Sequence, residues 1–360
     1  MSKEIYHRSA WGDVYEKFDA TNEMFVRSDN YENSNETDKL MAAINPKPSI
    51  LLTPTAYDNG SLHSVKPVLS PFADFDFTRG TIATRIAENG LIEDVTDTNL
   101  PRIDYTGGTG QILLEPQTTN LLTYSEDFSQ WSAGSTITLE SGFSAPDGTN
   151  NAYKLTKTGT AQPYLIFNAS LTTSSTRSIF AKTVSGTGTV NLLSHNSNTN
   201  NLFTLTENWQ RFDVTSSNST GVANFYAVDF RGSSSLSEII VFGANATNDQ
   251  SFATSYIPTS GSTVTRNADV CNNSGSSDLI NSTEGVLYAE IASFETNTAA
   301  KFITISDGTF NNRASISLSA AFSFRVFLRV GGSSQVDINL NVSDVKDYNK
   351  IAFSYKENDF

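Results

Sequence analysis

Short runs of β-branched and aromatic residues recur between residues 132 and 265, each closed by a turn of Gly, Ser, Asn or Asp. They follow one another at roughly the spacing of sandwich strands, about 8 to 12 residues. The runs are STITLES, NAYKLTK, PYLIFNA, RSIFAKTV, TVNLLS, NLFTLT, WQRFDVT, VANFYAVDF and LSEIIVFG. So many short strands bury their apolar faces best when they form two antiparallel sheets that pack against each other. The sequence therefore predicts a β-sandwich here.

A second strand-rich segment follows the polar spacer CNNSGSSDLINSTEG, and here apolar and polar residues alternate strictly. The apolar positions are Phe322, Phe324, Val326, Leu328, Val330, Val336, Ile338, Leu340 and Val342. A period of two indicates strands with one buried face. We predict a second sandwich over residues 283–360. Because the chain stops right after an apparent strand, KIAFSYKENDF, we expect this sandwich to be truncated, completed by another chain or represented only in part.

The residues before the first sandwich form two further segments. Residues 1–50 are dense in charges of both signs and predict a short N-terminal module, with a helical turn around TDKLMAAI. The prolines of NPKPS break any helix and indicate a boundary. Residues 51–130 predict a hairpin-rich connector, since AENGLI places an Asn-Gly turn between apolar flanks. The first sandwich then occupies residues 131–268.

Charge and cysteine content exclude several classes of function. The net charge of -14 repels phosphate backbones and anionic lipid, so we expect neither nucleic acid nor a membrane as partner. Cys271 alone forms no internal disulfide, and with only three scattered histidines the chain lacks zinc-ligand spacing. The N-terminus has no apolar signal region, so we expect synthesis in a cytoplasm or export by another route.

The sequence contains no recognisable catalytic motif, and we therefore expect that the chain is not an enzyme. The glycines of YTGGTGQ are followed by no GK[ST], so we interpret them as a turn and not a phosphate loop. Glu290 and Glu295 are the best candidates for the carboxylate pair of a glycan hydrolase. Their odd separation places them on opposite faces of a regular strand, which favours solvated carboxylates. His195 lies in a polar turn with no nucleophile beside it.

Exposed aromatic rings that stack on sugars are the alternative to catalysis. The candidates are Trp131, Tyr164 and Tyr226, each of which could equally pack in the sandwich core. A further set of acidic residues could hold calcium through carboxylate oxygens. Its members are Glu126, Asp127 and Asp249, although acidic turns are common in a chain of this composition.

Four ordered motifs resemble a connector found in structural and fibre proteins of tailed bacteriophages. They are FTRGTIATRI, GLIE, PRIDY and LLEPQTTNL, with Thr118 where arginine is frequent. The resemblance continues through TENWQRFDVT and SFATSYIPTSGSTVTRNAD, which are similar to the end of a carbohydrate-binding-module-type jelly roll. From EGVLYAEIASF onward the chain is similar to the first half of a laminin-G or concanavalin-like sandwich.

This resemblance implies a mainly β fold with tandem antiparallel sandwiches, a jelly roll and then a partial concanavalin or laminin-G-like domain. It also implies a head- or tail-fibre protein of the virion, assembled in the host cytoplasm and docked to other virion proteins through its N-terminal module. Such proteins bind host-surface glycans, commonly as trimers. Two alternatives remain open: a virion glycan depolymerase, and a decoration or plug protein that only bridges virion subunits.

Overall fold

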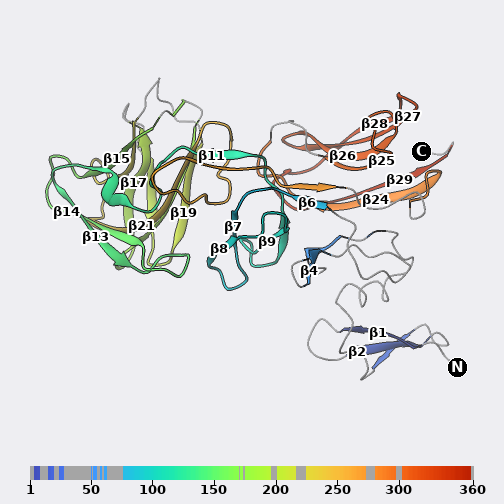
Figure 1. Cartoon of the computed structure of the whole chain (residues 1–360), viewed down its shortest axis with the longest axis horizontal. Coiled ribbons are helices and arrows are strands. Elements are labelled where there is room, and N and C mark those ends of the chain that lie inside the picture. The colour runs from blue at the N-terminus through green and yellow to red at the C-terminus, as the bar shows by residue number, and fades with distance from the viewer. Residues whose placement is uncertain are drawn as a thin grey trace. The chain divides into compact units, whose positions relative to one another are not determined.

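The computed structural model describes residues 50, 52–54, 76–169, 171–172, 175–195, 201–215, 224–272, 280–296 and 302–357, and the backbone of 4–8, 15–19, 24–27, 57–58 and 61–62. Of 195 and 224–226, too, only the backbone is described. The regular secondary structure of these residues is almost entirely β-strand and includes no α-helix, so the predicted mainly β fold is confirmed (Figure 1). No helix in this part of the chain could cross a membrane. The chain divides into two compact units, Met1–Ser274 and Gly275–Phe360.

The N-terminal residues form a three-stranded antiparallel sheet in the order β1-β2-β3. Its strands are β1 (Glu4–Arg8), β2 (Tyr15–Asp19) and β3 (Met24–Arg27). A short hairpin of β4 (Tyr57–Asp58) and β5 (Ser61–Leu62) follows. The helical turn predicted around TDKLMAAI lies outside the described residues.

The first sandwich consists of two five-stranded antiparallel sheets (Figure 1). One sheet has the order β12 (Ser132–Ala133), β15 (Tyr164–Asn168), β20 (Asn224–Asp229), β17 (Gly188–His195) and β18 (Leu202–Leu205). The other has the order β13 (Ile137–Phe143), β14 (Ala152–Lys157), β21 (Glu238–Thr247), β16 (Thr176–Thr183) and β19 (Gln210–Thr215). Each of the nine predicted runs overlaps one of these strands, so that prediction is confirmed.

Strand β21 is buried on both faces, from Ile239 to Thr247. Its residues Ile239 and Val241 pack into the core between the two sheets. Ile240 and Phe242 point the other way, into a second core with Phe180, Tyr256 and Ile92. Because Ile92 belongs to the predicted connector, the connector covers the outer face of this sheet. This explains why LSEIIVFG is a continuous apolar run and does not alternate.

The connector pairs with the segment that follows the last sandwich strand, β21, in the sequence. Strand β6 (Asp76–Thr78) pairs with β23 (Val270–Asn272), and β11 (Thr118–Asn120) pairs with β22 (Val264–Arg266). These pairings place residues 76–130 in the same compact unit as the sandwich. The predicted boundary at residue 130 therefore lies inside this compact unit, and the division into connector and sandwich stays a prediction.

Two predicted turns of the connector are present. Strand β7 (Ala83–Ile86) pairs with β8 (Ile92–Val95) across the Asn-Gly turn, where Gly90 has a φ of 81°. Strand β9 (Arg102–Asp104) pairs with β10 (Gln111–Leu113) across the GGTG turn. The glycines there make a hairpin and not a phosphate loop, as predicted.

A buried ion network joins the connector to the residues that follow the sandwich. Arg102 Nη1 lies 2.9 Å from the Glu115 carboxylate, and Arg266 forms a second ion pair with the same oxygen. Arg102 also pairs with Asp269, which Arg79 contacts at 3.1 Å. The side chains of all five residues are at most 5 % exposed. Removing one partner of such a network leaves another charge unpaired in a dry interior, so these residues hold the two segments together.

Acid is expected to weaken this unit through Glu115. Burial alone raises the pKa of Glu115, but Arg266 and Arg102 outweigh it and hold the pKa below its ordinary value. The stabilisation by the ionised carboxylate is thus complete above the unfolded pKa of about 4.3 and is lost as pH falls through the folded pKa. We expect the urea midpoint, followed by tryptophan fluorescence, to fall more steeply below about pH 5 in the natural chain than in Glu115→Gln. Equal slopes would contradict this assignment.

The second unit has two antiparallel sheets, with the orders β25-β26-β27-β28 and β24-β29. The four-stranded sheet contains β25 (Phe302–Ser306), β26 (Arg313–Ala320), β27 (Ser323–Val330) and β28 (Ser333–Asn341). The two-stranded sheet contains β24 (Glu284–Ile291) and β29 (Asn349–Lys356). Phe324, Val326 and Leu328 lie in the core of this unit, as their alternation predicts.

The predicted alternation fails at three apolar positions of this unit. Phe322, Val330 and Ile338 are exposed although they were predicted to be buried. Phe322 precedes the strand, and within the described residues a sheet of two strands faces a sheet of four, so apolar positions of the larger sheet remain uncovered. Phe327 shows the opposite difference: the alternation places it on the face of Arg325 and Arg329, opposite the apolar positions, and it is buried there.

Candidate ligand-binding sites

Trp131, predicted to stack on a sugar, is a core residue. It follows the 3-10 turn Phe128–Gln130, and only 6 % of it is exposed. Its ring lies 5.0 Å from the ring of Phe128 and 4.8 Å from that of Phe167, measured between centroids. Its Nε1 donates a hydrogen bond to the carbonyl oxygen of Tyr124 at 2.8 Å. Trp131 thus packs in the sandwich core, the alternative that the sequence left open, and sugar binding by this residue stays a prediction.

Tyr164 lies in β15 with one ring face covered. The Arg231 guanidinium sits 4.7 Å from the centroid of the Tyr164 ring. Asp229 fixes that guanidinium by accepting hydrogen bonds from Nε at 2.9 Å and Nη2 at 2.7 Å. Tyr226 pairs through its backbone with Ile166 and Ser194, and its side chain lies outside the described residues. Ligand binding by Tyr164 and Tyr226 stays a prediction.

The three acidic residues proposed as calcium ligands are each engaged by protein donors. Asp127 caps the 3-10 turn and accepts from the Tyr153 hydroxyl at 2.9 Å. Asp249 accepts from the Thr118 hydroxyl at 2.6 Å, and Glu126 accepts from the Tyr256 hydroxyl at 2.9 Å. Among the described residues no three His, Cys, Asp or Glu side chains form a group suited to a metal ion. The observed partners fit a role in folding better than calcium ligation.

The two carboxylates weighed as a hydrolytic pair have unlike surroundings. Glu290 is exposed in β24, 3.9 Å from the Lys350 ammonium group. Glu295 is buried, contrary to the prediction of a solvated side chain, and it lies beyond the end of β24 at Ile291, so the alternation of a regular strand does not apply to it. The side chain of His195 lies outside the described residues.

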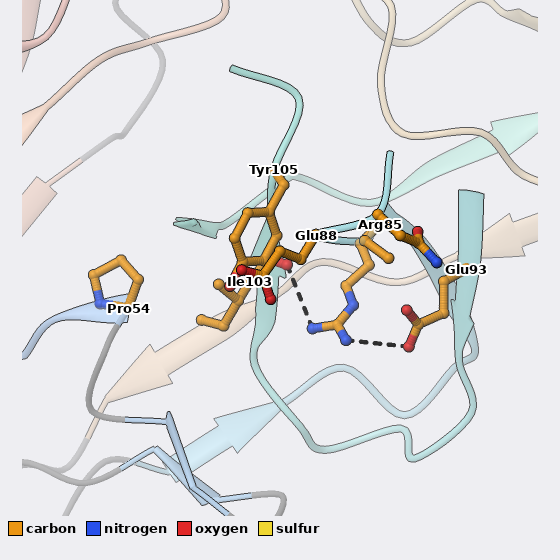
Figure 2. Close-up of a pocket in the computed structure, with 8 residues that line it drawn as sticks. Pro54, Arg85, Glu88, Glu93, Ile103 and Tyr105 are labelled. Carbon is orange, nitrogen blue, oxygen red and sulfur yellow. Dashed lines mark hydrogen bonds and ion pairs between the residues drawn. The ribbon is translucent and has the colours of Figure 1, made fainter. Parts of the chain in front are cut away.

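An open hollow of about 650 Å³ lies beside the two hairpins of the connector (Figure 2). It is lined by Pro54, Arg85, Ala87, Glu88, Asn89, Glu93, Ile103 and Tyr105. Figure 2 shows the Tyr105 ring and the Arg85 and Glu88 side chains directed toward the same space. Arg85 donates to the Ile103 carbonyl oxygen at 3.4 Å, and its Nη2 lies 3.1 Å from the Glu93 carboxylate.

Local sequence explains how the hollow is positioned. The Tyr105 amide donates to the Ile86 carbonyl oxygen at 3.0 Å, which ties the end of β9 to the end of β7. Gly110 lies against the Tyr105 ring, since a Cβ there would be 3.0 Å from its Cζ atom. The Asn89 side chain accepts from the Leu91 amide at 3.0 Å and closes the turn. Both turns are predictable from the sequence, whereas the hollow is not, because it forms only when the two hairpins lie together.

A second candidate site lies on the outer face of the sheet β25-β26-β27-β28. Three arginines surround the buried ring of Phe327, with guanidinium carbons 4.6 Å (Arg325), 5.2 Å (Arg313) and 5.3 Å (Arg329) from its centroid. Arg325 forms a two-bond ion pair with Asp337 at 2.6 Å, and this bond lowers the pKa of Asp337. The face therefore combines positive charge with aromatic rings in an otherwise acidic chain.

Comparison with known proteins gives little further information. No protein-family model matches the chain, and no curated protein matches it. Among solved structures, the N-terminal CBM22-1-CBM22-2 tandem domain of Xyn10C from Paenibacillus barcinonensis is similar with a TM-score of 0.25 and 11 % identity. That match covers 68 % of this chain and 87 % of the other. A likeness of this size establishes neither a shared fold nor a shared ligand.

Proposed function

We propose that this chain is a carbohydrate-binding protein and that the hollow beside Tyr105 is its sugar site. The observation that carries the proposal is the arrangement of one aromatic ring among side chains of both charges in one hollow. Its size of about 650 Å³ falls in the range of small-molecule sites, roughly 300 to 1,000 Å³. Rings pack on the C–H faces of sugars, while fixed polar groups select their hydroxyls.

The aromatic and polar side chains of the hollow have definite roles in this proposal. The half-buried Tyr105 ring supplies the apolar surface for a pyranose. Arg85 is already oriented by Glu93 and by the Ile103 carbonyl oxygen, so it loses little freedom when it donates to a hydroxyl. Glu88 and Asn89, on the exposed turn, supply acceptors and an amide donor. The site binds and does not hydrolyse.

The virion setting is the second part of the proposal. It is supported by the resemblance of FTRGTIATRI, GLIE, PRIDY and LLEPQTTNL to phage connectors. In this proposal residues 1–50 dock the chain to other virion proteins. A trimer presents three sugar sites, so its avidity for a glycan surface exceeds the weak affinity of a single site. Mass spectrometry of purified particles tests this part, and particles that lack the chain would refute it.

A bridging role between virion subunits is the second candidate. It is favoured by β24, where Val286 and Tyr288 are both exposed on one face of the strand. Exposed apolar side chains that share a strand face are typical of protein contacts. Glycan arrays without any bound sugar, together with protein contacts over β24 in an electron-microscopy map of the particle, would favour bridging over sugar binding.

Replacing Tyr105 by Ala is expected to weaken binding to the best sugar on a glycan array by about tenfold, because the stacking surface is lost. Tyr105→Phe keeps the ring and should bind within a few-fold of the natural chain. Tyr348→Ala removes an exposed tyrosine of the second unit and is the matched control. Equal affinities of the natural chain and Tyr105→Ala in calorimetry would exclude the hollow as the sugar site.

A further inference from the structure

Two arginines face each other across neighbouring strands of the second unit. Arg313 in β26 is the direct register partner of Arg329 in β27. Directly opposed side chains in an antiparallel pair lie close together, and like charges in such a pair repel each other. An anion that accepts hydrogen bonds from both guanidinium groups would turn this repulsion into attraction.

Neither arginine is neutralised within the described residues. On the same face only Arg325 has an acidic partner, Asp337. The Nε atoms of Arg313 and Arg329 are buried and have no hydrogen-bond partner in this part of the chain. A buried donor without a partner is unfavourable, so the pair presents unsatisfied donors as well as unopposed charge.

Aromatic rings hold the two guanidinium groups in place. Both lie against the Phe327 ring, and Arg313 also lies 5.2 Å from the ring of Phe310 and 5.9 Å from that of Phe302. Phe310 is 72 % exposed and Phe302 54 % exposed, so both rings also offer open apolar surface beside the charges. Fixed guanidinium planes suit the bidentate recognition of an oxyanion.

The row that contains the two arginines continues with hydroxyl groups. Ser306 of β25 is the register partner of Arg313, and Ser334 of β28 is that of Arg329. Across the four strands the register partners are therefore Ser306, Arg313, Arg329 and Ser334, so a serine flanks each arginine on its outer side. Hydroxyls can donate to an oxyanion or to the sugar that carries it.

We propose that Arg313 and Arg329 form a second binding site, which takes the carboxylate or sulfate group of an acidic glycan. Phe302 and Phe310 pack against the sugar ring that bears this group. A nucleic acid fits the face less well, because it needs a track of cations and the chain carries a net charge of -14. The glycan class rests on the proposed function, whereas the oxyanion site stands on the arginine geometry.

Calorimetry on the full chain tests the proposal with an array of acidic sugars: oligogalacturonate, sialyl-lactose and sulfated galactose oligomers. At least one of them is expected to bind the natural chain about tenfold more tightly than Arg313→Gln or Arg329→Gln. Lys350→Gln, which removes the same charge from an exposed site of the same unit, should bind like the natural chain. Both arginine variants should keep or exceed the natural melting temperature, since the repulsion between the pair is removed.

Each alternative outcome overturns the proposal. Binding of none of the acidic sugars would do so, as would equal binding of their neutral counterparts or equal losses in Lys350→Gln. Inorganic sulfate or a single-stranded oligonucleotide that binds as tightly as the best acidic sugar would show an anion site without glycan selectivity. The Tyr105→Ala variant separates the two sites: it should bind the sugar of the hollow about tenfold more weakly and bind the acidic sugar like the natural chain.

Discussion

Replacing Glu115 by Gln is expected to lower the free energy of unfolding of the first unit by about 3 to 5 kcal/mol. The substitution keeps the size of the side chain and an oxygen for the Ser255 amide, which donates to Glu115 Oε1 at 2.7 Å. It removes the charge that Arg102 and Arg266 share. Both guanidinium groups are fully desolvated, so an uncompensated positive charge remains in the interior.

Urea unfolding followed by tryptophan fluorescence measures this effect on the intended unit. The three tryptophans, Trp11, Trp131 and Trp209, all precede residue 275, so the signal does not report the second unit. Glu140→Gln is the matched control, because Glu140 forms an exposed ion pair with Lys154. Exposed pairs contribute roughly 0 to 1 kcal/mol. A loss for Glu115→Gln as small as that of the control would refute the role of the network.

The strands of this protein follow from local sequence, whereas its division into units does not. All nine runs of the first sandwich were predicted because each strand carries its own β-branched and aromatic residues between turn residues. The union of the connector with the sandwich depends on contacts between residues more than 150 positions apart, such as Arg102 with Asp269. No local pattern contains that information.

The four connector motifs of the sequence, together with a segment near residue 266, contain much of the buried network. Arg79 belongs to FTRGTIATRI, Arg102 to PRIDY, Glu115 to LLEPQTTNL and Arg266 to the segment STVTRNAD. The structure thus explains the role of these motif residues: their charges form buried ion pairs that join two segments distant in the sequence. A charged residue in a short motif reads from sequence as a surface group or a site, and only its burial reveals the structural role.

The candidate sites were the least predictable part. The sequence offers aromatic residues as candidates by type alone, and it does not show which of them are buried. Trp131 lies in the core. The hollow beside Tyr105 needs two hairpins side by side, and the opposed Arg313 and Arg329 need the register of β26 against β27. The alternation of arginines along β27 is visible in the sequence, but the pairing of Arg329 with Arg313 on β26 is not.

Replacing Asn120 by Asp is expected to destabilise the first unit by more than about 4 kcal/mol at neutral pH. Asn120 is completely buried, and its amide nitrogen donates to the carbonyl oxygens of Ala244 at 3.2 Å and Ile257 at 2.8 Å. Its Oδ1 accepts from the amides of Leu122 at 3.2 Å and Ala246 at 3.1 Å. One side chain thus joins three segments, and an ionised carboxylate would face two carbonyl oxygens without a proton to donate.

The pH dependence of this variant distinguishes its cause from a simple packing defect. Burial beside two carbonyl oxygens raises the pKa of an aspartate above its unfolded value of about 3.9, and a protonated carboxyl group can again donate one hydrogen bond. The loss relative to the natural chain should therefore shrink as the pH falls from about 7 to about 4.5. Asn99→Asp, an exposed site whose Oδ1 only accepts a hydrogen bond from the Arg79 amide, should be nearly neutral at both pH values. A loss for Asn120→Asp that is independent of pH would mean that the deficit arises from displaced backbone and not from the missing donors.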